Sequence, residues 1–159
     1  MTARLMNFIA SFLFAAGLAF AAPQPASAHN NGVVRVKSAY SMEETVARIT
    51  KDVAAKGIKL FEVIDQSKLA KDAGIDLKPS TLIIFGNPPL GTQFITAKPE
   101  AGLDWPVRLL VFQDDKGQVW MAYTDFGWIA RRHNIASRGP QFKMASEVIA
   151  SITSSATAR

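Results

Sequence analysis

The 159-residue sequence contains no cysteine. This absence excludes disulfide bonds, thiol catalysis, zinc sites built on thiolates and covalent haem attachment through cysteine. Without disulfides, the chain must fold on its hydrophobic core alone. The sequence also lacks a serine in a nucleophile-elbow pattern, a pair of histidines at helical metal-ligand spacing and a P-loop. It therefore carries no strong enzyme signature.

A single basic stripe is also absent, although the formal net charge is +5. Basic and acidic residues are interleaved through most of the chain, which is typical of a solvated surface rather than a nucleic-acid interface. The one local basic cluster comprises Arg131, Arg132, Arg138 and Lys143, and a patch for an anionic partner is the alternative interpretation. We expect no nucleic-acid partner.

Residues 1–28 have the three-part order of a secretory signal peptide. Arg4 supplies the positive region, Leu5–Ala22 is almost wholly apolar, and an Ala-Ser-Ala tripeptide ends at Ala28. An uncleaved membrane anchor is the alternative, because the apolar run approaches the length of a membrane span. We predict cleavage after Ala28, a periplasmic or secreted protein, and no membrane span in the mature chain.

The remaining residues, 29–159, have the size of one ordinary domain, with a core over about 33–152. Apolar patterning predicts strands at 33–36, 58–64, 81–85, 107–113 and 118–124. It predicts helices that begin at the caps Ser41, Asp65 and Asp125, and a last helix over 142–154 that frays from Ser154 onward. Because strands and helices are mixed without a strict βαβ repeat, we predict an α+β fold. Its sheet, antiparallel or mixed, would have about five strands and helices on one face.

The hairpin Val107–Thr124 is rich in apolar residues on both of its faces. An antiparallel hairpin at a sheet edge normally keeps one face polar. We interpret the excess as helices covering one face and another layer or subunit covering the other. The hairpin therefore predicts a homodimer.

Thr81–Thr92 is the stretch around which the chain is organised. An apolar run ends at Gly86, and Asn87, two prolines and Gly91 follow. Backbone N–H groups in such a turn can bind an anion or a carboxylate. Alternatively, turn chemistry alone explains every residue type present. The segment 93–97 that follows has no clear secondary structure in the sequence pattern.

Several motifs occur in an order that matches a known family pattern. They are the LIIFGNPPLGT run that ends at Thr92, the loop Leu103–Pro106, the Asp-Lys-Gly turn of the hairpin with Tyr123, and the segment Ala130–His133. From about Val33 to Ile152 the chain resembles the domain-of-unknown-function family 302. The resemblance implies a small α+β domain that pairs into homodimers and has no assigned biochemical role. Many members of that family carry a histidine directly after the aspartate that matches Asp65, whereas this chain has Gln66.

The leading functional hypothesis is a non-catalytic, dimeric binding or accessory domain for a small ligand or a partner. The candidate ligand-binding residues are Gly86, Asn87, Gly91, Asp65, Arg108 and Tyr123. Arg108 could also form a bidentate pair with Asp104 that fixes the loop before the hairpin.

The alternative hypothesis is a small hydrolase or isomerase in which Asp104 and His133 are acid–base groups. It requires Asp65, Asn87, Asp104, Tyr123 and His133 to converge on one cleft. Against it, a histidine at the end of a helix often interacts only with the helix C-terminus or with solvent.

A third hypothesis concerns copper, the one cofactor that the sequence suggests. Cleavage after Ala28 would leave His29 at the N-terminus, where the free amine and the ring Nδ1 form a chelate, and His133 could add a third nitrogen. Three nitrogens in a tetragonal arrangement suit Cu(II). The alternative is a chance histidine in a polar tail.

Overall fold

The structure is a computed structural model that describes residues 31–157. Its centre is a five-stranded sheet with the spatial order β1-β5-β4-β3-β2. The strands are β1 (Val33–Lys37), β2 (Lys59–Asp65), β3 (Ser80–Gly86), β4 (Val107–Gln113) and β5 (Val119–Thr124). Every neighbouring pair is antiparallel. The predicted α+β fold of about five strands is therefore confirmed, and the sheet is antiparallel rather than mixed.

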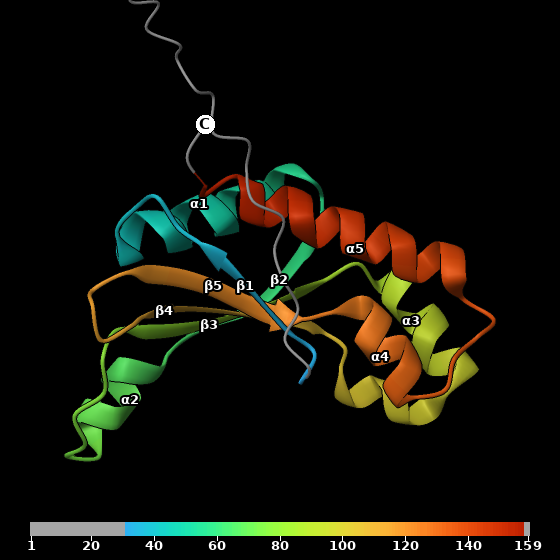
Figure 1. Cartoon of the computed structure of the whole chain (residues 1–159), viewed down its shortest axis with the longest axis horizontal. Coiled ribbons are helices and arrows are strands. Elements are labelled where there is room, and N and C mark those ends of the chain that lie inside the picture. The colour runs from blue at the N-terminus through green and yellow to red at the C-terminus, as the bar shows by residue number, and fades with distance from the viewer. Residues whose placement is uncertain (1–30, 158–159) are drawn as a thin grey trace, which may run out of the picture.

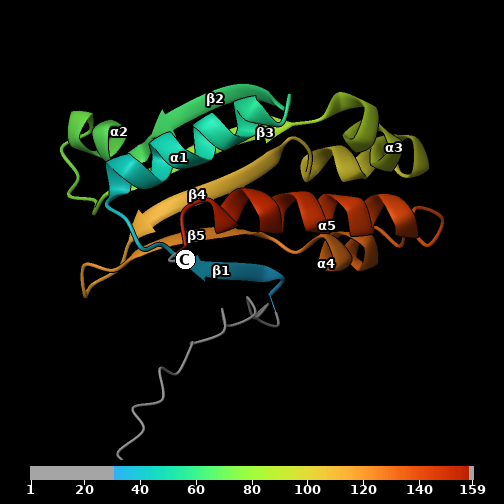
Figure 2. The same ribbon diagram turned by 90° about the horizontal axis from the view of Figure 1, so that it is seen from above.

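Two long helices, α1 (Met42–Ala55) and α5 (Gly139–Ser154), lie over the same face of the sheet (Figures 1 and 2). The shorter helix α2 (Gln66–Asp72) lies at one end of the molecule (Figure 1). At the other end are α3 (Pro88–Ala97), the 3-10 helix η1 (Pro99–Leu103) and α4 (Phe126–Arg132). The long helices thus cover one face, as predicted.

The capping signals in the sequence fix where the helices begin. Ser41 Oγ accepts a hydrogen bond from the Glu44 backbone N–H, 3.2 Å away, at the start of α1. Asp65 and Asp125 cap α2 and α4 in the same way. Gly57 follows α1 with φ of 65°, a left-handed conformation that glycine adopts without strain. The three predicted N-caps, Ser41, Asp65 and Asp125, are therefore confirmed.

The hydrophobic core lies between the sheet and the two long helices. Alternate residues of the central strands point toward these helices because side chains alternate between the two faces of a sheet. The sheet contributes Ile83, Phe85, Leu109, Val111 and Met121, and the helices contribute Ile49, Val53, Phe142, Ile149 and Ile152.

The opposite face of the sheet carries a second apolar layer. In residues 31–157, no helix crosses the middle of this face (Figure 1). Leu82 lies opposite Leu110, and Phe112 lies opposite Trp120, in the strand register. We call this surface the open face; its apolar side chains, half-buried and outside the core cluster, are Val33, Ile64, Leu82, Ile84, Leu110, Phe112 and Trp120.

The segment after Gly86 differs from the predicted turn. Asn87 is the N-cap of α3, and Pro88 and Pro89 occupy its first turn, where proline's missing N–H costs nothing and its fixed φ suits a helix. Residues 93–97, whose state the sequence left open, are the second half of this helix.

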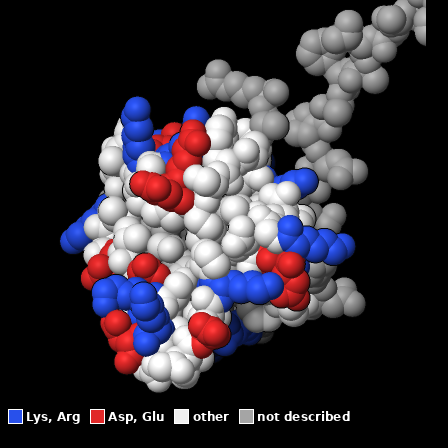
Figure 3. Space-filling view, turned by 90° about the vertical axis from the view of Figure 1, so that its left-hand side faces the viewer, with Lys and Arg blue, Asp and Glu red and all other residues white. Residues whose placement is uncertain are grey.

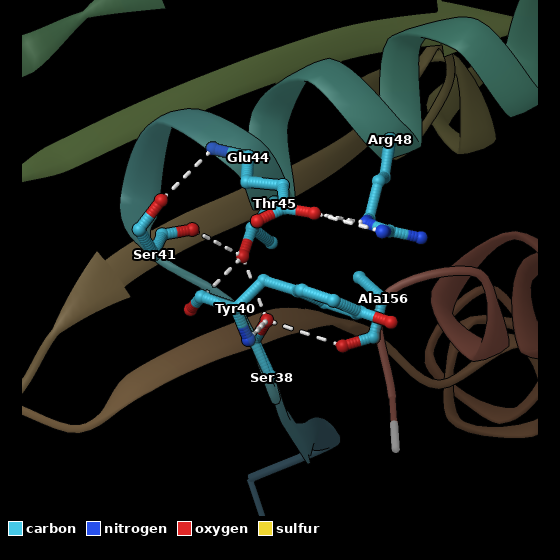
Figure 4. A network of polar contacts seen from close by, with 7 residues as sticks. All are labelled: Ser38, Tyr40, Ser41, Glu44, Thr45, Arg48 and Ala156. Carbon is cyan, nitrogen blue, oxygen red and sulfur yellow. Dashed lines mark hydrogen bonds and ion pairs between the residues drawn. The ribbon is translucent and has the colours of Figure 1, made fainter. Parts of the chain in front are cut away.

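The prediction that the chain frays from Ser154 is wrong for the described residues. The Ala156 side chain is fully buried, and its carbonyl accepts hydrogen bonds from the Ala39 N–H at 3.0 Å and from Ser38 Oγ at 3.1 Å. Ser38 Oγ also lies 2.6 Å from Thr45 Oγ1 (Figure 4). This network joins the end of β1, the first turns of α1 and the C-terminal segment.

Replacing Ser38 by alanine should lower the free energy of unfolding by about 1–2 kcal/mol, because buried polar partners lose a hydrogen bond. Urea denaturation followed by circular dichroism measures the change. The control is Ser137→Ala, since Ser137 is exposed. Equal midpoints for the two variants would contradict this role of Ser38.

Candidate functional site

Packing against Trp105 explains the glycines at positions 86 and 91. A methyl group added at Gly91 would lie 1.8 Å from Trp105 Nε1, and one added at Gly86 would lie 3.1 Å from the same atom. Asn87 Oδ1 accepts a hydrogen bond from the Leu90 N–H at 3.3 Å, and its carbonyl accepts one from the Gly91 N–H at 2.8 Å. The polar groups of this segment therefore begin a helix.

A small pocket lies beside this packing. Its volume is about 40 Å³, and most of its lining is apolar, including Phe85, Phe94, Trp105, Phe126 and Val148. Such a space holds a few water molecules at most, whereas ligand sites typically measure several hundred cubic ångströms. The ligand-binding role predicted for Gly86, Asn87 and Gly91 stays a prediction, and the pocket adds no support to it.

A buried ionic cluster surrounds Asp104. Asp104 is 9% exposed and His133 is 8% exposed, with His133 Nε2 lying 2.6 Å from Asp104 Oδ2. Arg132 Nη1 lies 3.0 Å and 3.1 Å from the two carboxylate oxygens. His133 is thus buried against a carboxylate rather than turned to solvent at the helix end.

The bidentate pair expected between Asp104 and Arg108 does not form. Arg108 Nη2 lies 3.6 Å from Asp104 Oδ1 and donates a hydrogen bond to the Leu103 carbonyl. Arg132 contacts both carboxylate oxygens instead, because α4 folds back toward the loop before β4. The cluster therefore joins that loop to the end of α4.

The other predicted site residues form no hydrogen bond or ion pair with this cluster. Asp65 caps α2 by accepting from the Lys68 N–H at 2.9 Å, and Asn87 caps α3. Tyr123 lies opposite Val34 in the sheet, and burial raises the pKa of its hydroxyl, with the nearby Asp125 charge acting in the same direction. Of the five residues that the enzyme hypothesis requires in one cleft, the structure brings together Asp104 and His133.

Sequence reasoning missed a polar and aromatic cluster on the open face. The Arg35 guanidinium carbon lies 4.7 Å from the centre of a Trp120 ring and 5.0 Å from that of Phe112. Trp120 Nε1 donates to Asp114 Oδ2 at 2.8 Å, and this hydrogen bond is the largest cause of the lowered pKa of Asp114. The available signal was the alternation of β1, which puts Arg35 on the same face as Trp120.

Charges of both signs mix at the end of the molecule that carries α2. Figure 3 shows blue and red groups beside one another around uncharged surface. This face agrees with the interleaved charge pattern of the sequence. Within residues 31–157, no group of three or more histidine, cysteine or acidic side chains could hold a metal ion. His29 lies outside the described residues, so the copper hypothesis stays a prediction.

Gly91→Ala should destabilise the protein by about 1–3 kcal/mol, because the added methyl group overlaps Trp105. The control is Gly139→Ala, where a methyl group meets no atom within 4 Å. Thermal unfolding followed by tryptophan fluorescence measures both. If the two variants melt together, the close approach of Trp105 to Gly91 is refuted.

Asp104→Ala should lower the free energy of unfolding by about 2–3 kcal/mol, since it removes charged hydrogen bonds and leaves buried His133 without its acceptor. Asp72→Ala breaks the exposed ion pair with Lys68 and should cost at most about 0.5 kcal/mol. Chemical denaturation compares the two. Equal losses would show that the Asp104 cluster does not stabilise the fold.

Comparison with known proteins identifies sequence relatives of this chain. Two proteins named "Fluoride-specific ion channel FluC 1", from Brucella suis biovar 1 and Brucella abortus biovar 1, are each 40% identical over 113 residues, or 71% of this chain. The match covers 44% and 42% of their own lengths, so the chain spans less than half of these relatives. None of the helices in the described part of the chain is both long and apolar enough to cross a membrane.

A solved structure shares the fold. The crystal structure of an uncharacterised conserved DUF302 protein from Bacillus stearothermophilus matches with a TM-score of 0.71 at 15% identity, over 79% of this chain and 98% of that one. The family described as "Domain of unknown function DUF302" matches residues 34–156. The chain therefore belongs to the DUF302 family.

Proposed function

We propose that this protein is an exported, non-catalytic accessory domain that works as a homodimer, with the open face as the dimer surface. The observation that supports this dimer surface is the second apolar layer on β1–β5, which α1 and α5 leave uncovered (Figure 1). Cleavage after Ala28 would release the domain into the periplasm or the medium.

The apolar composition of the open face favours contact with another protein surface over contact with water. Antiparallel sheets that face solvent usually alternate apolar and polar positions, whereas here Leu82, Ile84, Leu110, Phe112 and Trp120 all point outward. Contiguous apolar patches of this kind mark interaction surfaces. Two sheets that pack face to face interdigitate their side chains about 10 Å apart and exclude water from both layers.

The available area is compatible with a dimer. Five strands about 4.8 Å apart and about 20 Å long present roughly 500 Å² in projection, and side-chain relief makes the accessible area larger. A standard interface buries about 800 Å² on each partner. Leu69 and Leu77, in and after α2, are 58% and 50% exposed and extend the apolar surface at one end.

The longer relatives support an accessory role rather than an enzymatic one. More than half of each FluC protein lies outside the matched stretch. We infer that the membrane-spanning channel lies in that remainder, since no described helix of this chain could span a membrane. The present chain would then be a stand-alone counterpart of a domain that accompanies a membrane protein.

Sedimentation velocity at micromolar concentration should show a dimer for the mature protein. Leu110→Lys should give a folded monomer, because a lysine in the centre of the open face would have to be buried without a partner. Met144→Lys on α5, an exposed position over the other face, should remain dimeric. A wild-type monomer at this concentration would overturn the proposal.

A further inference from the structure

Charged side chains of opposite sign lie on the two edge strands of the open face. Arg35 and Lys37 are on β1, at one edge of the sheet, and Glu62 is on β2, at the other edge. In the register, Arg35 is level with Leu110, whereas Glu62 is level with Arg108, two residues away. The offset along the strands is about 7 Å. One corner is therefore basic and the diagonally opposite one carries an acid.

The basic corner is preorganised. The Arg35 guanidinium is held over Trp120 and Phe112, and its Nε is buried with no hydrogen-bond partner. Among the described residues Arg35 forms no ion pair. No hydrogen bond joins Arg35 to Asp114, whose two oxygens accept from the Trp120 indole and from the backbone of Lys116 and Gln118, although the nearby Arg35 charge is one cause of the lowered pKa of Asp114. The Arg35 guanidinium is thus held at a fixed position by two aromatic rings, without a hydrogen bond or ion pair among the described residues.

The acidic corner is free to bind a cation. Glu62 is exposed, and its one hydrogen bond within residues 31–157 comes from the Val63 backbone N–H at 3.2 Å. Two other cations of this face are engaged locally: Arg108 contacts Leu103 and Asp104, and Lys59 Nζ lies 5.1 Å from the centre of the Phe61 ring.

We propose that Arg35 of each subunit binds the partner's Glu62 across the dimer; this rests on the proposed function. A two-fold axis that lies between the two open faces, passes through the midpoint between Arg35 and Glu62 and is perpendicular to the line that joins them places each Arg35 opposite the partner's Glu62, twice by symmetry. An axis perpendicular to the strands would instead place β1 over β1 and bring two Arg35 side chains together, which like-charge repulsion disfavours.

Burial makes the pairing necessary as well as favourable. When the faces close, Arg35 loses its remaining water, and an uncompensated buried charge is strongly destabilising. A carboxylate accepts from the two terminal nitrogens of a guanidinium through two parallel hydrogen bonds. Glu62 of the partner subunit would therefore bind the terminal nitrogens of Arg35 at the surface of the open face.

Charge reversal tests the pairing. Arg35→Glu and Glu62→Arg should each weaken the dimer by at least about tenfold in Kd, because each creates two like-charge contacts. A one-to-one mixture of these two variants should restore the dimer, since both contacts in the heterodimer then join opposite charges. Sedimentation of the single variants and of the mixture is the measurement, and circular dichroism confirms folding. Lys51→Glu and Glu100→Arg, at exposed positions on α1 and η1, are the matched controls and should dimerise normally.

The outcomes separate this pairing from the dimer itself. A wild-type monomer overturns the proposed function and the pairing together. A wild-type dimer whose single variants associate normally, or whose mixture is no tighter than the variants alone, overturns the pairing and leaves the dimer standing. Restoration in the mixture supports the pairing, because independent damage to each subunit would not be repaired by mixing.

Discussion

The rest of this structure depends on one constraint: its central strands are apolar on both faces, but its long helices can cover only one. Burial of Ile83, Leu109 and Met121 against α1 and α5 supplies the hydrophobic free energy that a chain without disulfides requires. The same alternation directs Leu82, Leu110 and Trp120 to the opposite side. The fold that builds its core thus builds an apolar surface at the same time.

Two different sets of contacts hold together the end of the molecule away from α2. Trp105 packs against Gly86 and Gly91, where glycine is required for close approach and not for its backbone conformation. Beside it, Asp104 binds His133 and Arg132 and so attaches α4 to the loop before β4. The Trp105 packing and the Asp104 cluster both stabilise the fold of one subunit. The open face and its charged side chains have no such role within one subunit, and association of two subunits would explain them.

Local signals in the sequence were enough for most of the fold. Alternation gave the five strands, and the caps Ser41, Asp65 and Asp125 gave three helix starts, because these effects act within a few residues. The start of α3 was missed because proline and glycine favour turns as well as helix N-termini. Contacts between distant segments, such as Arg132 with Asp104 and Ala156 with Ser38, follow from tertiary packing and carry no local signature. For the same reason, the sequence named Asp104 and His133 but not their pairing.

The central claim is that the open face is buried by a second copy of the chain. The most direct measurement is the relaxation of methyl protons by a soluble paramagnetic probe, recorded above and below the dissociation constant of the dimer. The account predicts that the methyl groups of Leu82 and Leu110 are protected at high concentration and become accessible on dilution, while Met144 is accessible throughout. Accessible Leu82 and Leu110 methyl groups at every concentration would contradict it.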